Sequence, residues 1–213
     1  MRALRPTILL ISLSLTGTPF ALAEEDKAIL LFNGKDLSGW KRVSADPANN
    51  PESTWTVRDG ILHCTGSPVG YIRTEKAHSN YRLHLEWRWV EKGDNSGVLI
   101  HATGPDKVWP KAIEPQIQKG RSGDLWLIDG FEVREHVNKE DRRIAKPAED
   151  SEKPLGEWNE MEVVCRGSSL QVFVNGVLQN DVHDCSVTEG FIGLQSEAHP
   201  IQFRDIRLTP ASD

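Results

Sequence analysis

The sequence predicts an all-β protein built as an antiparallel sandwich. Three observations support this class: strand-like alternation recurs along the chain, helical periodicity is almost absent, and turn-forming residues follow at short intervals. The longest alternation runs from Tyr81 to Val90, where apolar side chains alternate with polar or charged ones. Because successive side chains on a strand point to opposite faces, this pattern indicates a strand with one buried face.

The first 23 residues have the order of segments found in a secretory signal peptide. Arg2 and Arg5 precede an apolar run from Ile8 to Leu15, and Ala21-Leu22-Ala23 fits a cleavage site. The apolar run is too short to span a bilayer, which takes about 20 residues. We therefore expect a mature chain that begins at Glu24, is exported to the periplasm or the extracellular space, and has no transmembrane segment.

Residues 24–213 are expected to form one domain, since the 190 residues that remain (213 minus 23) fit a single all-β domain with a sizeable core. Cleavage would remove two arginines and no acids, so the formal charge would change from −6 to −8. This acidic balance argues against nucleic acid as a partner. The odd number of cysteines, Cys64, Cys165 and Cys185, leaves two arrangements open: one disulfide with one buried thiol, or three free thiols.

The first half of the mature chain contains one strand-like run and one hairpin. Ile29 to Phe32 is an apolar run that ends at Asn33-Gly34. Trp55 to Val57 and Ile61 to Thr65 flank Asp59-Gly60, and both turn residues tolerate a positive φ. This arrangement predicts a tight β-hairpin.

The central segment, residues 95–118, carries the candidate site. It holds two strand-like runs, Gly97 to His101 and Ile113 to Gln118, joined by a loop that contains Trp109. In the second run one face is apolar, and the other is a polar row of Glu114, Gln116 and Gln118. If the runs are neighbours, His101 shares a face with Glu114. A polar row is typical of a solvated surface, but the nearby Trp and His favour a surface that binds sugar.

Pro115 interrupts this second run with a residue that has no backbone N–H. We therefore expect its strand to lie at a sheet edge, to contain a bulge, or to leave that position unpaired.

The last third of the chain begins with a charged segment, residues 132–154, for which a solvated surface loop is a commoner outcome than a lid over the site. Strands follow at Trp158 to Cys165 and Ser169 to Val174, and Asn175-Gly176 predicts a second hairpin turn. The final strands are expected at Gly190 to Gln195 and Ile201 to Leu208.

A bulge is expected in the final strand. Phe203 and Ile206 are three residues apart, so both can be buried only if an extra residue is inserted at Arg204-Asp205.

Five separated motifs stand in order along the mature chain: Leu31 to Trp40, Asn95 to Val98, Glu114 to Ile117, Gly156 to Asn159 with Val174 to Gly176, and Gly193 to Gln195 with Phe203 to Ile206. Together they resemble the 3-keto-disaccharide hydrolase family over nearly the whole mature chain. The resemblance implies a concanavalin A-like jelly roll of two packed antiparallel sheets with a concave face that binds sugar. Pro115 departs from the aromatic residue that the family often has there, and Ser196 to His199 replaces an Asp-His-Gly type of loop.

The chemistry that the resemblance implies is cleavage of a 3-keto-glycoside. A ketone at C3 acidifies the hydrogen on C2, so a base can remove it, an enolate forms, and the C1 substituent leaves before water adds. This route needs a base, an enolate stabiliser and an acid for the leaving oxygen. Glu114 is the candidate base and His101 the candidate acid or enolate-stabilising donor. The candidate sugar-binding residues are Gln116, Gln118 and Trp109, with Glu197 and His199 added from the last loop.

No cofactor is evident from the sequence. A divalent metal could stabilise the enolate, although no metal-ligand spacing such as HExxH is visible.

Three alternatives stay open. An ordinary retaining glycosidase needs two carboxylates about 5 to 5.5 Å apart, and the amides of Gln116 and Gln118 that follow Glu114 count against it. A non-catalytic carbohydrate-binding module would bind sugar without turnover. A structural interaction domain of the cell envelope would bind no sugar at all.

Overall fold

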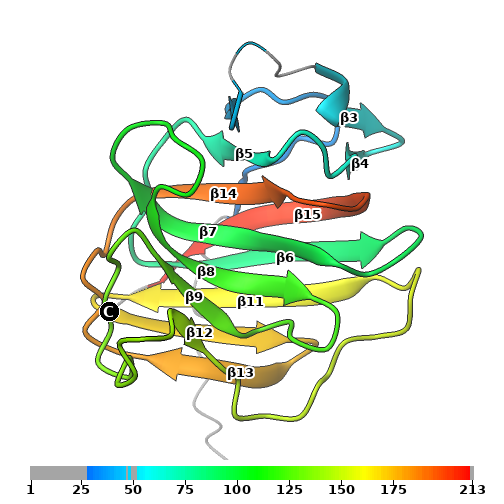
Figure 1. Ribbon diagram of the computed structural model, residues 1–213. Coiled ribbons are helices and arrows are strands. Elements are labelled where there is room, and N and C mark those ends of the chain that lie inside the picture. Colours follow the sequence, from blue (N-terminus) through cyan, green and yellow to red (C-terminus); the bar gives the residue numbers. More distant parts are fainter. Residues whose placement is uncertain (1–27, 47, 49–51, 212–213) are drawn as a thin grey trace, which may run out of the picture.

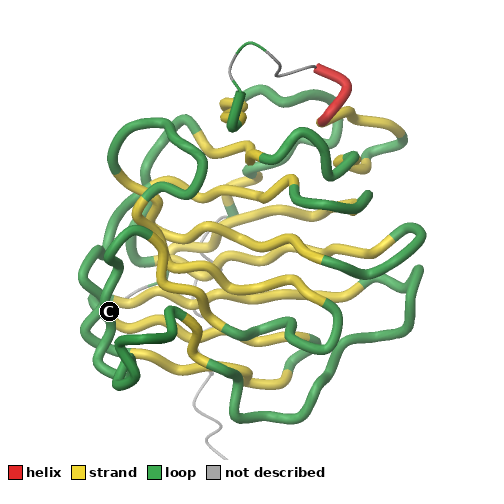
Figure 2. The backbone as a smooth tube through the Cα atoms, viewed as in Figure 1, coloured by secondary structure: helices red, strands yellow, loops and turns green. Residues whose placement is uncertain are grey.

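The computed structural model describes residues 28–46, 48 and 52–211, and these form two antiparallel β-sheets packed face to face (Figure 1). The predicted all-β sandwich is confirmed. Among the described residues the single helical segment is a short 3-10 turn, η1 (Glu52–Thr54), and strands dominate the rest (Figure 2). The predicted signal peptide, its cleavage site and the expected mature start at Glu24 lie outside the described residues.

The larger sheet contains eight strands: β1 (Ile29–Leu30), β3 (Trp55–Arg58), β4 (Ile61–Cys64), β6 (Tyr81–Trp89), β11 (Asn159–Arg166), β12 (Ser169–Val174), β13 (Val177–Val182) and β15 (Ile201–Pro210). Their spatial order is β13-β12-β11-β6-β15-β4-β3, with β1 also paired to β15. Consecutive strands are not always neighbours, since β6 lies between β11 and β15.

The smaller sheet contains seven strands: β2 (Trp40–Ser44), β5 (Gly70–Thr74), β7 (Asn95–Thr103), β8 (Lys111–Gln118), β9 (Leu125–Ile128), β10 (Arg143–Ile144) and β14 (Phe191–Ser196). Their order is β10-β9-β8-β7-β14-β5-β2. The neighbours of β7 are therefore β8, which follows it in the chain, and β14, which lies about 90 residues later. This pairing brings distant segments of the sequence together at the centre of the sheet.

The hydrophobic core lies between the two sheets. Strand β6 shows why: its apolar residues Tyr81, Leu83, Leu85, Trp87 and Trp89 are all buried, as the alternation predicts. The facing side chains come from the smaller sheet and include Val98, Ile100, Ile113 and Ile117. Burial of so many large apolar side chains is the main favourable contribution to folding.

Both predicted hairpins are present. Strands β3 and β4 pair across Asp59-Gly60, whose φ angles are 51° and 75°, and β12 and β13 pair across Asn175-Gly176, at 49° and 78°. Positive φ at both central positions is the geometry of the tight hairpin turn.

The predicted bulge in β15 is also present. The register of β15 with β6 shifts between Arg204 and Arg207, and Asp205 has a φ of 50°. As a result, Phe203 and Ile206 are both fully buried.

Pro115 lies in an interior strand, because β8 is between β7 and β9. The β7 register pairs Gly97 with Gln116 and Ile100 with Ile113, but it contains no pair for Glu114 or Pro115. On its other side Pro115 pairs with Leu125 of β9, so of the three expectations the unpaired position is the one observed, and only toward β7.

The three cysteines are all free thiols and all buried. Burial raises the pKa of Cys64 and of Cys185 to about 11 each and that of Cys165 to about 12. Such thiols remain protonated near neutral pH and act as small apolar side chains.

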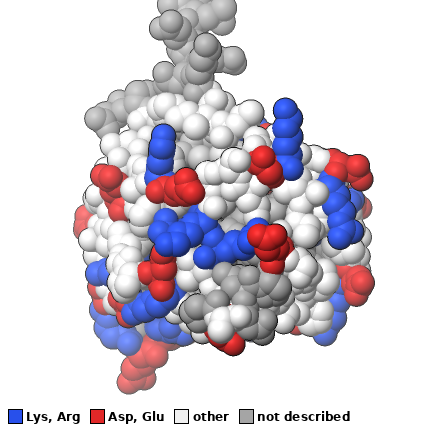
Figure 3. Space-filling model, turned by 90° about the horizontal axis from the view of Figure 1, so that it is seen from above, with Lys and Arg blue, Asp and Glu red and all other residues white. Residues whose placement is uncertain are grey.

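Basic and acidic side chains are interspersed on the surface that is seen from above the sandwich (Figure 3). Ion pairs among the described residues include Lys41 with Asp106 and Arg42 with Glu52. The described part of the chain contains no helix with the length and apolar composition that a membrane crossing requires.

Candidate functional site

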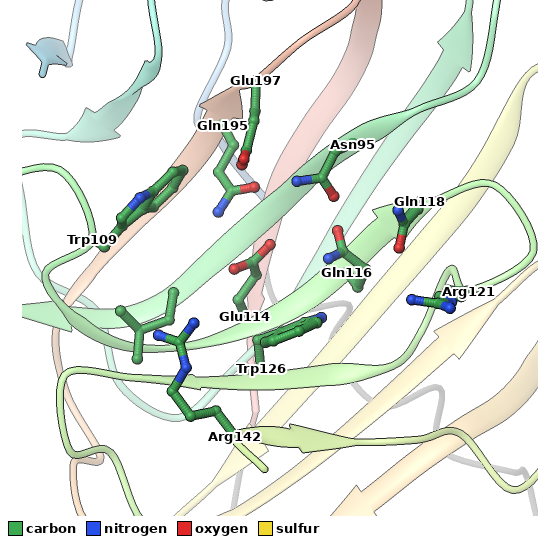
Figure 4. A pocket seen from close by; sticks show the side chains of 11 residues that line it. Asn95, Trp109, Glu114, Gln116, Gln118, Arg121, Trp126, Arg142, Gln195 and Glu197 are labelled. Atoms are coloured by element: carbon green, nitrogen blue, oxygen red, sulfur yellow. The ribbon is translucent and has the colours of Figure 1, made fainter.

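The smaller sheet carries a pocket of about 290 Å³ on its face turned away from the core (Figure 4). The pocket is built by β7, β8, β9, β14 and the loops next to them. Its lining combines amides, carboxyls, guanidinium groups and aromatic rings: Asn95, Trp109, Glu114, Gln116, Gln118, Arg121, Trp126, Ile128, Arg142, Gln195 and Glu197. This is the mixture of apolar and hydrogen-bonding surface that a sugar needs.

Strand β8 supplies three of the sequence-predicted residues. Glu114, Gln116 and Gln118 line the pocket, while Ile113 and Ile117 on the opposite face pack into the core. Gln116 is held in place because its Oε1 accepts a hydrogen bond from the backbone N–H of Ile117 at 3.0 Å. The period of 2 along the strand therefore places the whole polar row in one cavity.

Glu114 lies at the centre of the pocket and is only 6 % exposed. Its burial raises the pKa of the carboxyl well above the ordinary value, and the negative charge of Glu197 acts in the same direction. A hydrogen bond with Gln195 and the positive charge of Arg142 oppose this rise in pKa. A buried carboxyl with a raised pKa is a group that acid–base chemistry can use near neutral pH.

Glu197 provides a second carboxyl on the opposite wall of the pocket, from the loop that follows β14. Its pKa is raised, chiefly by burial and further by the charge of Asp94, although a hydrogen bond with Asn95 counteracts the rise. Two carboxyls with raised pKa values therefore line one cavity.

Trp109 also lines the pocket, as expected. It lies in the loop between β7 and β8 and packs against a second apolar cluster that includes Tyr71, Leu99 and Ile128. This cluster covers part of the outer face of the sheet, so the open part of that face is the polar half that carries Glu114.

The expectation that His101 shares a face with Glu114 is wrong. The register of β7 with β8 shifts between Ile100 and Thr103, and His101 adopts a φ of 53°, so a bulge reverses the direction of its side chain. The ring lies edge-on to Tyr81 of the larger sheet, 5.8 Å between centroids, and its Nδ1 is 3.1 Å from the carbonyl oxygen of Val187. Burial lowers the pKa of His101 to about 4, so the ring is a neutral core residue at physiological pH.

His199 lies two positions after the lining residue Glu197 but does not itself line the pocket. Its Nδ1 lies 2.6 Å from Oδ2 of Asp94, in the loop that precedes β7. The pair joins the loop after β14 to the start of β7, and so helps to fix the loop that carries Glu197.

Several lining residues were not predicted as site residues: Asn95, Arg121, Trp126, Ile128, Arg142 and Gln195. Asn95 and Gln195 do belong to the motifs that carry the family resemblance, which was the one available signal for them. Arg142 comes from the charged segment 132–154, so this segment contributes to the site and is not only a solvated loop. Its guanidinium carbon is 5.7 Å from the ring centroid of Trp126.

Potential metal ligands gather elsewhere in the described part of the chain. The two groups of three that lie close enough to share an ion both contain His84, with Glu160 and Glu162 or with Glu86 and Asp205. They lie on the outer face of the larger sheet, on β6, β11 and β15. The sequence left open whether a divalent metal is used. Among the described residues, the pocket does not contain such a group of three ligands for it.

Comparison with known sequences agrees with the family resemblance of the five sequence motifs. A family model described as "3-keto-alpha-glucoside-1,2-lyase-like domain" matches residues 27–209. A protein of Bacteroides thetaiotaomicron named 3-keto-disaccharide hydrolase is 25% identical, and the alignment covers 87% of this chain and 79% of that protein.

Two crystal structures of candidate glycosyl hydrolases from Parabacteroides distasonis have a similar fold. One is 20% identical with a TM-score of 0.66, covering 90% of this chain and 98% of the other. The second is 25% identical with a TM-score of 0.63, covering 86% and 99%. The predicted jelly-roll sandwich is confirmed as a fold that glycosyl hydrolases use.

Proposed function

Because the chain belongs to the family of 3-keto-alpha-glucoside-1,2-lyase-like domains, we propose that it is an exported enzyme that cleaves 3-keto-glycosides or 3-keto-disaccharides. The observation that carries the proposal is the buried carboxyl of Glu114 at the centre of a pocket of sugar-binding character. The name of the Bacteroides relative supports the same substrate class.

In the proposed reaction Glu114 acts as the base. Its carboxylate takes the proton from C2 of the sugar, and the electron pair of that C–H bond forms the enolate with the C3 ketone. Collapse of the enolate breaks the bond from C1 to its oxygen substituent and leaves a double bond between C1 and C2. Water then adds across this double bond, with its oxygen on C1 and a hydrogen from solvent on C2, which completes the hydrolysis. A base removed from water is stronger than an exposed one, which is why the raised pKa of Glu114 suits this step.

Two further charged groups have roles in this proposal. Glu197 lies on the opposite wall of the same pocket, and its raised pKa increases the fraction of this carboxyl that carries a proton for the leaving oxygen at a given pH. Arg142 places a positive charge near Glu114, where the negative charge of the enolate would develop. Glu197 and Arg142 thus take the tasks that the sequence had assigned to His101.

The length of the pocket supports a substrate with more than one sugar unit. Trp109 and Arg142 lie at one end, and Gln118 and Arg121 lie at the other, with Glu114 between them (Figure 4). Gln118 lies four positions after Glu114 along the strand, a rise of about 13 Å. The reacting sugar would lie over Glu114, toward Trp109 and Arg142, and the leaving group would extend to the Gln118 end, where amides and Arg121 can hold hydroxyls.

An assay in deuterated water tests the proposal. The purified protein is incubated with a 3-keto-glucoside and with its unoxidised parent, and both aglycone release and deuterium uptake at C2 are followed. We expect release from the 3-keto substrate with exchange at C2, and no release from the parent. Sugar binding without release from either compound would indicate a carbohydrate-binding module and contradict the proposal.

An ordinary glycoside hydrolase is the second candidate, because Glu197 supplies the second carboxyl that the sequence of β8 lacks. It predicts cleavage of the unoxidised parent with no exchange at C2, so the same assay separates the two candidates.

Export is the remaining part of the proposal and rests on the charged, apolar and small-residue segments of residues 1–23. Mass spectrometry of the protein from its native host should find an amino terminus near Glu24, and a retained Met1 would contradict export by this route.

A further inference from the structure

Gly97 of β7 lies directly beside the carboxyl of Glu114. A Cβ atom added at Gly97 would be 2.2 Å from Oε1 of Glu114 and 2.8 Å from both its Cδ and its Cγ. Cβ atoms essentially never approach heavy atoms within 3.0 Å. The Glu114 side chain therefore occupies the space that any side chain at position 97 would need.

The local backbone does not call for glycine at this position. Gly97 does not have a positive φ, and it pairs with Gln116 in the regular part of the β7–β8 register. Glycine in the interior of a strand is unfavourable by roughly 0.5–1 kcal/mol relative to alanine. The close approach of Glu114 is thus the physical reason for a glycine here.

The carboxyl of Glu114 lies over the backbone of β7 and reaches a partner on the next strand. Glu114 sits with its carboxyl against the β7 backbone on one side, and with Gln195, which is 1 % exposed, as its hydrogen-bond partner. Gln195 belongs to β14, the other neighbour of β7. The side chain of Glu114 therefore reaches across β7, and a side chain at position 97 would block that path.

We propose that Gly97 is a positioning residue, whose missing side chain holds the Glu114 carboxyl in its place in the pocket. This inference rests on the proposed function, in which Glu114 is the base. A reacting group displaced by about 1 Å can lose about 100-fold in rate, so the size of residue 97 controls catalysis without contact between residue 97 and the substrate.

The first test is the Gly97→Ala variant with the 3-keto-glucoside as substrate. We expect kcat to fall by roughly 100-fold with a smaller change in KM, because the binding amides remain. The acidic limb of the pH–rate profile should shift to lower pH, since the displaced carboxyl becomes hydrated. Gly193→Ala on β14 is the matched control: its Cβ would meet Leu99 and the backbone oxygen of Ile72 at 3.2–3.3 Å but not Glu114, and kcat should stay within about two-fold.

The second test is a double-mutant cycle of Gly97→Ala with Glu114→Ala. Its readout is urea unfolding, which does not depend on enzyme activity. The loss of stability caused by Gly97→Ala should be greater when Glu114 is present than in the Glu114→Ala background, because the colliding atoms are then gone. Should Gly97→Ala alone fail to fold while the double variant folds, the same conclusion holds.

An equal loss of stability in both backgrounds, or a wild-type kcat and pH profile in Gly97→Ala, would overturn the inference. Failure of the wild-type protein to cleave any 3-keto-glycoside would instead contradict the proposed function, and the stability cycle would still decide whether Gly97 positions Glu114.

Discussion

The outer face of each sheet carries a polar row of side chains, and the two rows differ in how their charges are partnered. On the larger sheet the carboxylates of Glu162 and Glu86 pair with Arg82 and Arg204 in partly exposed positions. On the smaller sheet the Glu114 carboxyl is buried and has the amide of Gln195 as its hydrogen-bond partner. Partly exposed ion pairs contribute little free energy, whereas a buried carboxyl changes its pKa and can react.

The two rows also differ in what covers them. The outer row of the larger sheet is made of long side chains, and the guanidinium carbons of Arg88 and Arg204 lie over the ring of Trp158, 4.6 and 4.1 Å from its centroid. The pocket on the smaller sheet is instead walled by loops, among them the Trp109 loop and the segment of Arg142. The polar row of the larger sheet therefore lies on a partly exposed surface, and that of the smaller sheet lines a pocket.

The largest expected effect comes from replacing the buried carboxyl. Glu114→Gln keeps the size and most of the hydrogen-bonding capacity but removes the basic oxygen, so turnover of a 3-keto-glycoside should fall by about 100-fold or more. Glu162→Gln, the same substitution on the larger sheet, should leave turnover unchanged. If Glu114→Gln keeps full turnover while Glu197→Gln or His199→Ala abolishes it, the site is organised around the loop after β14.

The pH dependence of stability sharpens the comparison. The pKa of Glu114 is raised in the folded protein. Between the ordinary glutamate pKa of about 4.3 and this raised pKa, Glu114 is therefore protonated to a greater extent in the folded protein than in the unfolded chain. The contribution of Glu114 to the free energy of unfolding is therefore lost as the pH rises from that value through the raised pKa.

Glutamine does not titrate, so the stability of Glu114→Gln relative to wild type should increase over this pH range. Urea unfolding at a series of pH values measures the difference, and a difference that does not change with pH would show that Glu114 is not buried in solution.

A smaller effect is expected for Gln116→Ala. Loss of one hydrogen bond to the sugar costs about 1 kcal/mol, which corresponds to a rise in KM of roughly five-fold with kcat little changed. Steady-state kinetics on the 3-keto-glucoside measure it. Gln171→Ala on the outer face of β12 is the control, and an equal change in both variants would argue against a binding role for Gln116.

The smallest effect is expected on the larger sheet. Arg82 and Glu162 form an ion pair of 3.0 Å with side chains that are 46% and 24% exposed, so a double-mutant cycle with Arg82→Gln and Glu162→Gln should give a coupling of about 1 kcal/mol or less. A coupling of several kcal/mol would contradict the view that the ion pairs on the outer face of the larger sheet contribute little free energy.

The sequence by itself determined the local features of this protein. Alternation along β8 was enough to place Glu114, Gln116 and Gln118 together, because side-chain direction on a strand follows from the period of the chain. The hairpin turn at Asp59-Gly60 was likewise readable, because it depends on the φ preferences of adjacent residues.

Only the tertiary structure decided which distant groups surround Glu114. Gln195 and Glu197 reach the pocket because β14 pairs with β7, and Arg142 reaches it because β10 pairs with β9. Such pairings depend on the packing of the whole sandwich and leave no local signal. The same holds for His101: one extra residue in β7 turned it from the pocket into the core, since a shift of one residue exchanges the two faces of a strand.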